Sequence, residues 1–132
     1  MILTIDPTAA VPVSEQIAEQ IRFAIATGRV GVGEKLPSVR GLAKDLLVNP
    51  NTVAKVYRDL EREGILRTRP GSGAFVAEDA GESCVEQSRQ IAADALETGV
   101  AKGVAAGLKA KEIRELVSEC LGKARGKAGS HA

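Results

Sequence analysis

Four polar residues recur at helical spacing in the segment that follows Pro50. The stripe consists of Asn51, Lys55, Arg58 and Arg62, at i, i+4, i+7 and i+11. On a helix these side chains would share one face. An amide can read base edges through paired hydrogen bonds, and lysine or arginine can hold phosphates in a major groove. The same stripe also suits the solvated face of an ordinary amphipathic helix, so its chemistry depends on its surroundings.

The stripe requires a helix with an apolar opposite face, and the sequence predicts one between Asn49 and Gly64. Asn49 can accept hydrogen bonds from the first free amides, and Pro50 suits the first turn, where no amide donor is needed. Gly64 is a stop signal. The apolar positions of this helix are Val53, Val56, Tyr57 and Leu60.

A second, shorter helix is predicted directly before it. Ser38 can cap this helix, and the small residue Ala43 stands where the two helices must approach. Its apolar face comprises Val39, Leu42, Ala43 and Leu46. Residues 46–49 connect the two helices. Two short helices with such a connection indicate a helix-turn-helix.

Residues 65–76 change character and predict a hairpin. The runs Ile-Leu-Arg-Thr-Arg and Ala-Phe-Val flank a Pro-Gly-Ser-Gly turn. Arg67 and Arg69 lie on this hairpin, where a wing could contact a groove, and Arg40 lies on the preceding helix. Residues 38–76 hold seven basic and four acidic side chains, a net +3 within a chain of net +1. This local excess, with the outward helix start at Asn49, favours a DNA-binding surface over a merely solvated face.

The composition restricts the other classes of function. The 132 residues suffice for one domain and an appendage. Only 2% of them are aromatic, which excludes a surface that stacks bases or sugars, while 44% are hydrophobic and mostly aliphatic, as in packed helices.

A first helix is predicted after Pro12 and before Gly28. Its apolar positions are Val13, Ile17, Ile21 and Ile25.

Residues 12–76 resemble the winged-helix domain of the GntR family of bacterial transcriptional regulators. The matching motifs are LPSVR before the second helix, NPNTVAKVYRDLE in the third, and RPGSGAFV in the wing. The resemblance implies that DNA is contacted by Arg40, Asn49, Asn51, Thr52, Lys55 and the wing from Gly71 to Gly73. Many members carry basic residues at the positions of Pro50 and Ala54, and glycine at the position of Leu47, so the base contacts here are fewer or different.

The segment after the wing predicts two more helices, one from Glu82 to Gly107 and one from about Lys111 to Leu121. This short extension resembles that of the YtrA-like subfamily, which implies dimerisation. Glycines at every fourth residue, with alanines before them, suggest close approach by another helix, for which a helix of a second copy is a candidate. The alternative is a helix broken at Gly99 or Gly103. The expected dimerisation residues are Ile91, Ala95, Gly99, Gly103, Gly107, Ile113, Leu116 and Val117.

Other chemistries find little support. The glycines of residues 28–33 have the spacing of a phosphate-binding loop, but Glu34 stands where that loop requires lysine. Cys84 and Cys120 have neither CxxC spacing nor a histidine partner, and His131 lies in the tail. We therefore expect no enzyme activity, metal or cofactor, and assign the cysteines to the core or an interface. With no secretory signal or membrane span, the expected location is the cytoplasm.

The sequence thus predicts a mainly α fold with a small β-hairpin: a winged helix-turn-helix domain over 1–77, a helical dimerisation region over 78–122 and a flexible basic tail over 123–132. The expected partners are double-stranded operator DNA and a second copy of the chain, with no membrane. The predicted function is that of a transcriptional regulator that acts as a repressor and binds an inverted repeat, with a transporter operon as the expected target. A winged helix that binds only proteins is the alternative. The candidate DNA-binding residues are Ser38, Arg40, Asn49, Asn51, Thr52, Lys55, Arg58, Arg69, Gly71, Ser72 and Gly73.

Overall fold

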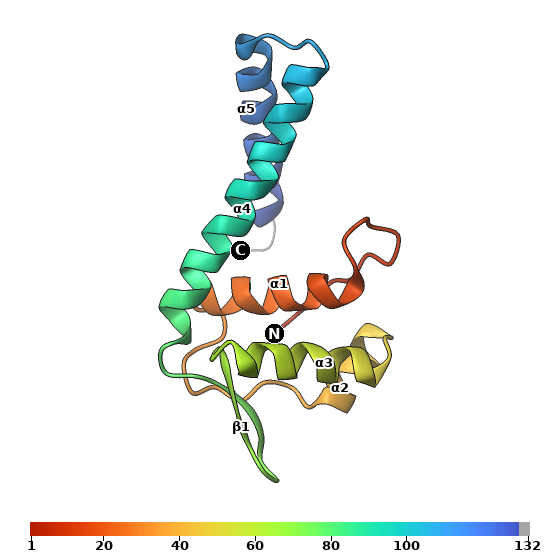
Figure 1. Cartoon of the computed structure of the whole chain (residues 1–132), viewed down its shortest axis with the longest axis vertical. Helices are drawn as coiled ribbons and strands as arrows, with labels where there is room; N and C mark the ends of the chain where they lie inside the picture. Colours follow the sequence, from red (N-terminus) through yellow and green to blue (C-terminus); the bar gives the residue numbers. More distant parts are fainter. Residues whose placement is uncertain (130–132) are drawn as a thin grey trace. The chain divides into compact units, whose positions relative to one another are not determined.

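The computed structural model describes residues 1–129 and has two compact units, one over residues 1–90 and one from residue 91 onward. The elements confirm a mainly α fold with one hairpin (Figure 1). In chain order they are α1 (Val13–Ala26), α2 (Val39–Leu46), α3 (Pro50–Arg62), β1 (Leu66–Arg69), β2 (Gly73–Val76), α4 (Ala80–Ala105) and α5 (Ala110–Gly129). No helix in the described range combines the length and hydropathy needed to cross a membrane.

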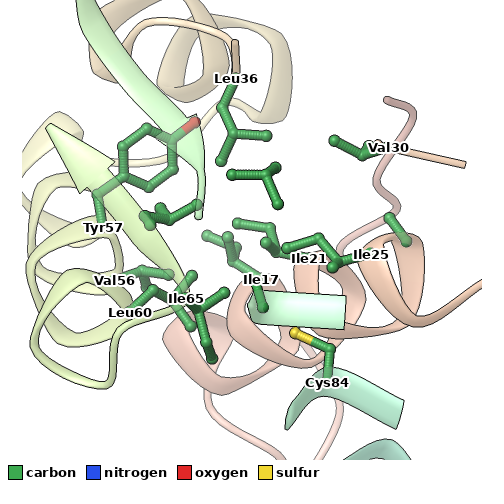
Figure 2. Packing of buried hydrophobic residues seen from close by; sticks show 14 of the residues in the cluster. Ile17, Ile21, Ile25, Val30, Leu36, Val56, Tyr57, Leu60, Ile65 and Cys84 are labelled. Carbon is green, nitrogen blue, oxygen red and sulfur yellow. The ribbon is translucent and has the colours of Figure 1, made fainter. Parts of the chain in front are cut away.

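The core of the first unit is aliphatic, as the composition requires. Ile17 and Ile21 of α1 are fully buried against Leu60 of α3 and Ile65 after it, within one cluster (Figure 2). Each such side chain removed from water contributes about 1.5–3 kcal/mol. The core therefore holds α3 rigidly by its apolar face and leaves its polar face free.

The two helices of the helix-turn-helix begin at the predicted caps. The Ser38 hydroxyl accepts a 3.0 Å hydrogen bond from the amide of Gly41, and the Asn49 side chain accepts one of 2.8 Å from the amide of Asn51. Helix α2 ends at a leucine, where many helices have a glycine in the left-handed conformation. Leu47 takes the left-handed conformation at φ +57°, and it is the one non-glycine residue in the described range with positive φ.

A third extended segment widens the hairpin. Strands β1 and β2 pair antiparallel, with Arg67 opposite Phe75 and Arg69 opposite Gly73. Residues 33–36 run along the other edge of β2, where Lys35 is opposite Phe75 in an antiparallel bridge. The wing is thus anchored on both sides of β2, which the sequence did not predict.

Helix α4 begins inside the first unit. Ala80 and Cys84 are buried in the same cluster as α1 and α3, and the sulfur of Cys84 points toward Ile17 in Figure 2. The predicted domain boundary after residue 77 therefore precedes the observed division, which falls after Gln90. The first turns of α4 complete the winged-helix core rather than starting the appendage.

The second unit consists of the rest of α4 and α5, joined by a short turn. Helix α4 is unbroken through Gly99 and Gly103 and ends at Ala105, so the broken-helix alternative is wrong. Gly107 follows at φ +84°, and the amide of Leu108 donates to the Gly103 carbonyl at 3.0 Å. This bond and the one that the amide of Gly107 donates to the Val104 carbonyl, also at 3.0 Å, form a Schellman motif. Gly107 therefore ends the helix and does not belong to a stripe of small residues along it.

Helix α5 is longer than predicted. It continues to Gly129, eight residues past the expected end at Leu121, so residues 123–129 of the predicted tail are helical. Gly122 and Gly126 lie inside it because isolated glycines lower helix stability without stopping a helix. His131 lies outside the described residues.

Candidate DNA-binding surface

The predicted polar stripe lies on the exposed side of α3. Asn51, Lys55 and Arg58 are exposed, as is Arg62 one turn later, whereas the apolar positions of the helix are buried. Thr52, implied by the family resemblance, is half-buried, and its amide donates to the Asn49 carbonyl at 3.0 Å. The start of α3 thus presents amide side chains beside the positive end of the helix dipole, which favours a phosphate nearby.

Asp59 modifies the charge of this stripe. Its carboxylate lies 3.5 Å from the ammonium of Lys55 and 3.5 Å from the guanidinium of Arg62, one turn to either side. All three side chains keep substantial exposure, so the pairs contribute little to stability. Their effect is electrostatic, because one carboxylate partly neutralises two cations on the face that would approach DNA.

The start of α2 is positioned by a hydrogen bond from α3. The hydroxyl of Tyr57 donates to the carbonyl of Pro37 at 2.7 Å, next to the cap at Ser38. Burial raises the pKa of Tyr57 to about 12. Arg40 is exposed on the first turn of α2. The sequence predicted Tyr57 only as an apolar core residue. Its helical spacing indicates that the ring is buried but does not indicate which group the hydroxyl bonds.

The wing presents its arginines to solvent. Arg67 and Arg69 are exposed on β1, and the guanidinium carbon of Arg69 lies 4.9 Å from the centre of the Phe75 ring. This cation–π contact restricts Arg69 without neutralising it. Gly71 at φ +78° and Gly73 at φ +114° make the tight turn between the strands, with Ser72 exposed between them.

Arg22 ties three helices of the first unit together. Its guanidinium pairs with the Glu63 carboxylate at 2.7 Å and donates to the Gln87 side chain at 2.7 Å, and Gln87 donates to Ser83 at 2.8 Å. Glu63 directly follows α3, and Gln87 lies on α4. The network therefore fixes the end of α3 against both α1 and the first turns of α4.

The second unit carries an apolar groove of about 530 Å³ between its two helices. It is lined by Ala95, Leu96, Gly99, Val100, Gly103, Leu108, Ile113, Leu116, Val117, Cys120, Leu121 and Ala124. Six of the predicted dimerisation residues are among these; Ile91 is half-buried elsewhere on α4, and Gly107 occupies the turn. Several large side chains of the groove stay exposed, including Leu96 at 60% and Leu116 at 46%.

The close helix approach expected at the glycines occurs within one chain. A Cβ atom added to Gly103 would lie 3.2 Å from two carbons of the Ile113 side chain on α5, whereas one added to Gly99 would meet nothing within 4 Å. The idea of close approach is therefore right for Gly103, although its neighbour is α5 of the same chain. Gly99 opens into the groove instead.

The two cysteines differ in their surroundings. Cys84 is buried in the core, and this burial raises the pKa of its thiol; Cys120 is exposed at the groove. The described residues contain no group of histidine, cysteine and carboxylate side chains that could hold a metal ion.

Comparison with known proteins places these features in a family. The family described as "Bacterial regulatory proteins, gntR family" matches residues 13–76, which span α1 to the wing. The HTH-type transcriptional repressor YtrA of Bacillus subtilis is 36% identical over 124 residues, covering 94% of this chain and 95% of that protein. The similarity therefore includes the second unit.

Solved structures agree with this assignment. A GntR family transcriptional regulator from Listeria monocytogenes superposes with a TM-score of 0.71 at 33% identity, covering 87% of this chain and 98% of the other. The DNA-binding domain of AraR in complex with operator ORX1 is 29% identical, with a TM-score of 0.52, and covers 58% of this chain and 95% of that one. This chain belongs to the GntR family and is a DNA-binding transcriptional regulator, not an enzyme.

Proposed function

We propose that the protein is a homodimeric repressor that binds an inverted-repeat operator in double-stranded DNA and occludes a promoter. The observation that carries the proposal is the exposed stripe on α3, which begins at a capped helix N-terminus and is flanked by the wing arginines. A helix with such a face is suited to a major groove, with its first residues at the base edges.

The role of each residue follows from its place. Asn51 and Lys55 face outward from the first turns of α3 and would read base edges. Arg40 on α2 and Arg58 further along α3 would bind phosphates, which set the orientation of the protein on the duplex. On the wing, Arg69 and the turn from Gly71 to Gly73 would contact the DNA backbone beside the groove that α3 enters.

The apolar groove of the second unit supports the homodimer. One winged helix with a modest local charge binds DNA weakly, whereas two linked copies reach two half-sites about 34–36 Å apart. The exposed leucines and valines along the groove would be covered by the same groove of a second copy, because a two-fold interface joins identical surfaces. The names of the relatives, one of them a repressor, support repression. We propose the cytoplasm, where the chromosome lies, as its location, and the resemblance to YtrA-like regulators supports a transporter operon as the target.

A binding titration tests the DNA part of the proposal. Fragments from the promoter region upstream of the protein's own gene, with an inverted repeat intact or one half-site scrambled, are titrated with protein at several salt concentrations. Tight, salt-dependent binding that needs both half-sites is expected. The double variant Lys55→Ala, Arg40→Ala should bind the intact fragment at least tenfold more weakly. Binding to no DNA at any salt concentration would favour a module that binds only proteins.

Sedimentation equilibrium tests the dimer. Leu116→Asp places a charge in the groove and should shift the protein to monomer. Val104→Asp is the matched control, since Val104 is 62% exposed in the same unit but does not line the groove. Equal dimerisation of both variants would refute the groove as the interface.

A further inference from the structure

The solvent face of the wing includes a lysine from outside the wing. Lys35 lies in the loop before α2, at a position with no periodic pattern in the sequence, and its backbone pairs with the free edge of β2. The amide of Leu36 donates to the Ala74 carbonyl at 2.9 Å, and the amide of Val76 donates to the Glu34 carbonyl at 3.0 Å. These two bonds bracket Lys35 and Phe75 as a non-hydrogen-bonded antiparallel pair, whose side chains stand close together on one face.

The register across the three segments places three cations together. Phe75 is opposite Lys35 on one side and Arg67 on the other, and Arg69, two residues on from Arg67, shares that face. The opposite face is the core face, where Leu36, Leu66 and Val76 are buried. The solvent face of the wing, defined here as Lys35, Arg67, Arg69, Gly73 and Phe75, therefore carries three positive charges and no carboxylate.

Contacts across this face hold the cations in place. A Cβ atom added to Gly73 would lie 3.0 Å from Cε of Lys35 and 3.8 Å from its ammonium nitrogen, so the lysine stem crosses the space that a side chain would occupy. The Phe75 ring restricts Arg69 through the cation–π contact at 4.9 Å. Lys35 is exposed, and neither it nor the two arginines is paired with a carboxylate in any ion pair of the described residues.

We infer that Lys35 is a phosphate-contacting residue, so that the DNA surface of the wing is a three-cation face built from two separate segments of the chain. Lys35 lies on the solvent face of the wing and not on α3, so it is placed beside the DNA backbone, whose row of phosphates suits the point charge of a lysine. This inference rests on the proposed function, because it takes double-stranded DNA as the ligand. It adds a residue that the helix-turn-helix and wing motifs do not contain.

The salt dependence of DNA binding tests the inference. Lys35→Ala is compared with Arg29→Ala, which removes the same charge from the loop after α1, where the Arg29 guanidinium donates to Thr27. The homodimer loses one phosphate contact from each copy, so the magnitude of the slope of log K against log salt should fall by about 1.8. Between about 50 and 200 mM salt this corresponds to roughly a 12-fold smaller loss of affinity than in the unaltered protein. Lys35→Ala should show this change on operator and on unrelated DNA alike, and Arg29→Ala should not.

Three outcomes would overturn the inference. The first is an unchanged slope for Lys35→Ala, and the second is an effect confined to one base pair of the operator, which would make Lys35 a base reader. The third is an equal change for Arg29→Ala, which would reduce the effect to net charge. If the unaltered protein binds no DNA, the proposed function itself fails, and this result is distinct from the other three.

A measurement on the unaltered protein guards against loss of folding in the variant. Lysine acetylation by a water-soluble reagent, read by mass spectrometry, reports the exposure of each amine with and without operator DNA. Lys35 should be protected by DNA, while Lys102 on α4 should react equally in both conditions. Equal labelling of Lys35 with and without DNA would refute the contact.

Discussion

The strained turn at the end of α2 predicts a stabilising substitution. Leu47 adopts φ +57°, where the Cβ of an L-residue crowds the following carbonyl at about 1–2 kcal/mol. Its side chain is 91% exposed, so removing it loses almost no packing. The geometry is required, because the amide of Val48 donates to the Ala43 carbonyl at 3.0 Å only if residue 47 turns left-handed.

Leu47→Gly should therefore relieve the strain. Glycine also makes the unfolded chain more flexible, which offsets about 0.4–1 kcal/mol. The net gain in the free energy of unfolding is about 0.8 kcal/mol, which for a unit of this size raises Tm by roughly 3–6 °C. Thermal unfolding followed by circular dichroism, with urea titration as a second measurement, gives both quantities.

Two controls separate backbone strain from other causes. Leu47→Ala removes the exposed side chain but keeps Cβ, so it should leave the stability within about 0.5 kcal/mol of the original. Val32→Gly places glycine at another exposed loop position that lacks positive φ, and it should destabilise by about 0.4–1 kcal/mol. If Leu47→Gly is neutral or destabilising while both controls behave as expected, the strain argument is wrong.

Three further predictions concern single side chains. Tyr57 is the one tyrosine of the chain, so the ultraviolet absorbance of tyrosinate should titrate near pH 12. The pKa of Tyr57 is raised from 10.0 in the folded state. Its contribution to stability is therefore present below pH 10 and is lost as pH rises from 10 to 12. Asp59→Asn should strengthen binding to unrelated DNA about three- to tenfold at low salt by freeing its two cations, whereas Glu61→Gln on the same helix should have a smaller effect. Gly103→Leu should lower the free energy of unfolding of the second unit by about 1–3 kcal/mol, because the larger side chain overpacks against α5. Gly122 has open space around it, so Gly122→Ala should raise that free energy by about 0.8–1 kcal/mol. Urea titration measures both changes.

Local chemistry explains which parts of the fold could be predicted from the sequence. The caps at Ser38 and Asn49 were predictable because each satisfies an amide two or three residues away. The buried face of α3 was predictable because helical periodicity selects it directly. The hairpin was predictable from its turn residues, because the residues that determine the turn lie within a few positions of one another in the sequence.

Contacts between distant segments explain what could not be predicted. Lys35 reaches the wing through backbone pairing with a strand forty residues later, and a side-chain pattern does not record such pairing. The end of α5 was misplaced because Gly122 resembles a stop signal but lies inside a helix. The predicted boundary after residue 77 differs from the division after Gln90, because the spacing within α4 does not reveal that Cys84 is buried in the same cluster as α1.

The burial of Ala80 and Cys84 has a consequence for the order in which the protein is made. Chains emerge from the ribosome N-terminus first, so α1 to the wing are synthesised before the segment that closes their core. A nascent chain that has reached only Ala77 leaves one side of Ile17 and Ile21 uncovered, a surface that favours aggregation. Folding of the DNA-binding unit is completed only when the first turns of α4 are available, and a fragment intended to fold alone should extend to Gln90.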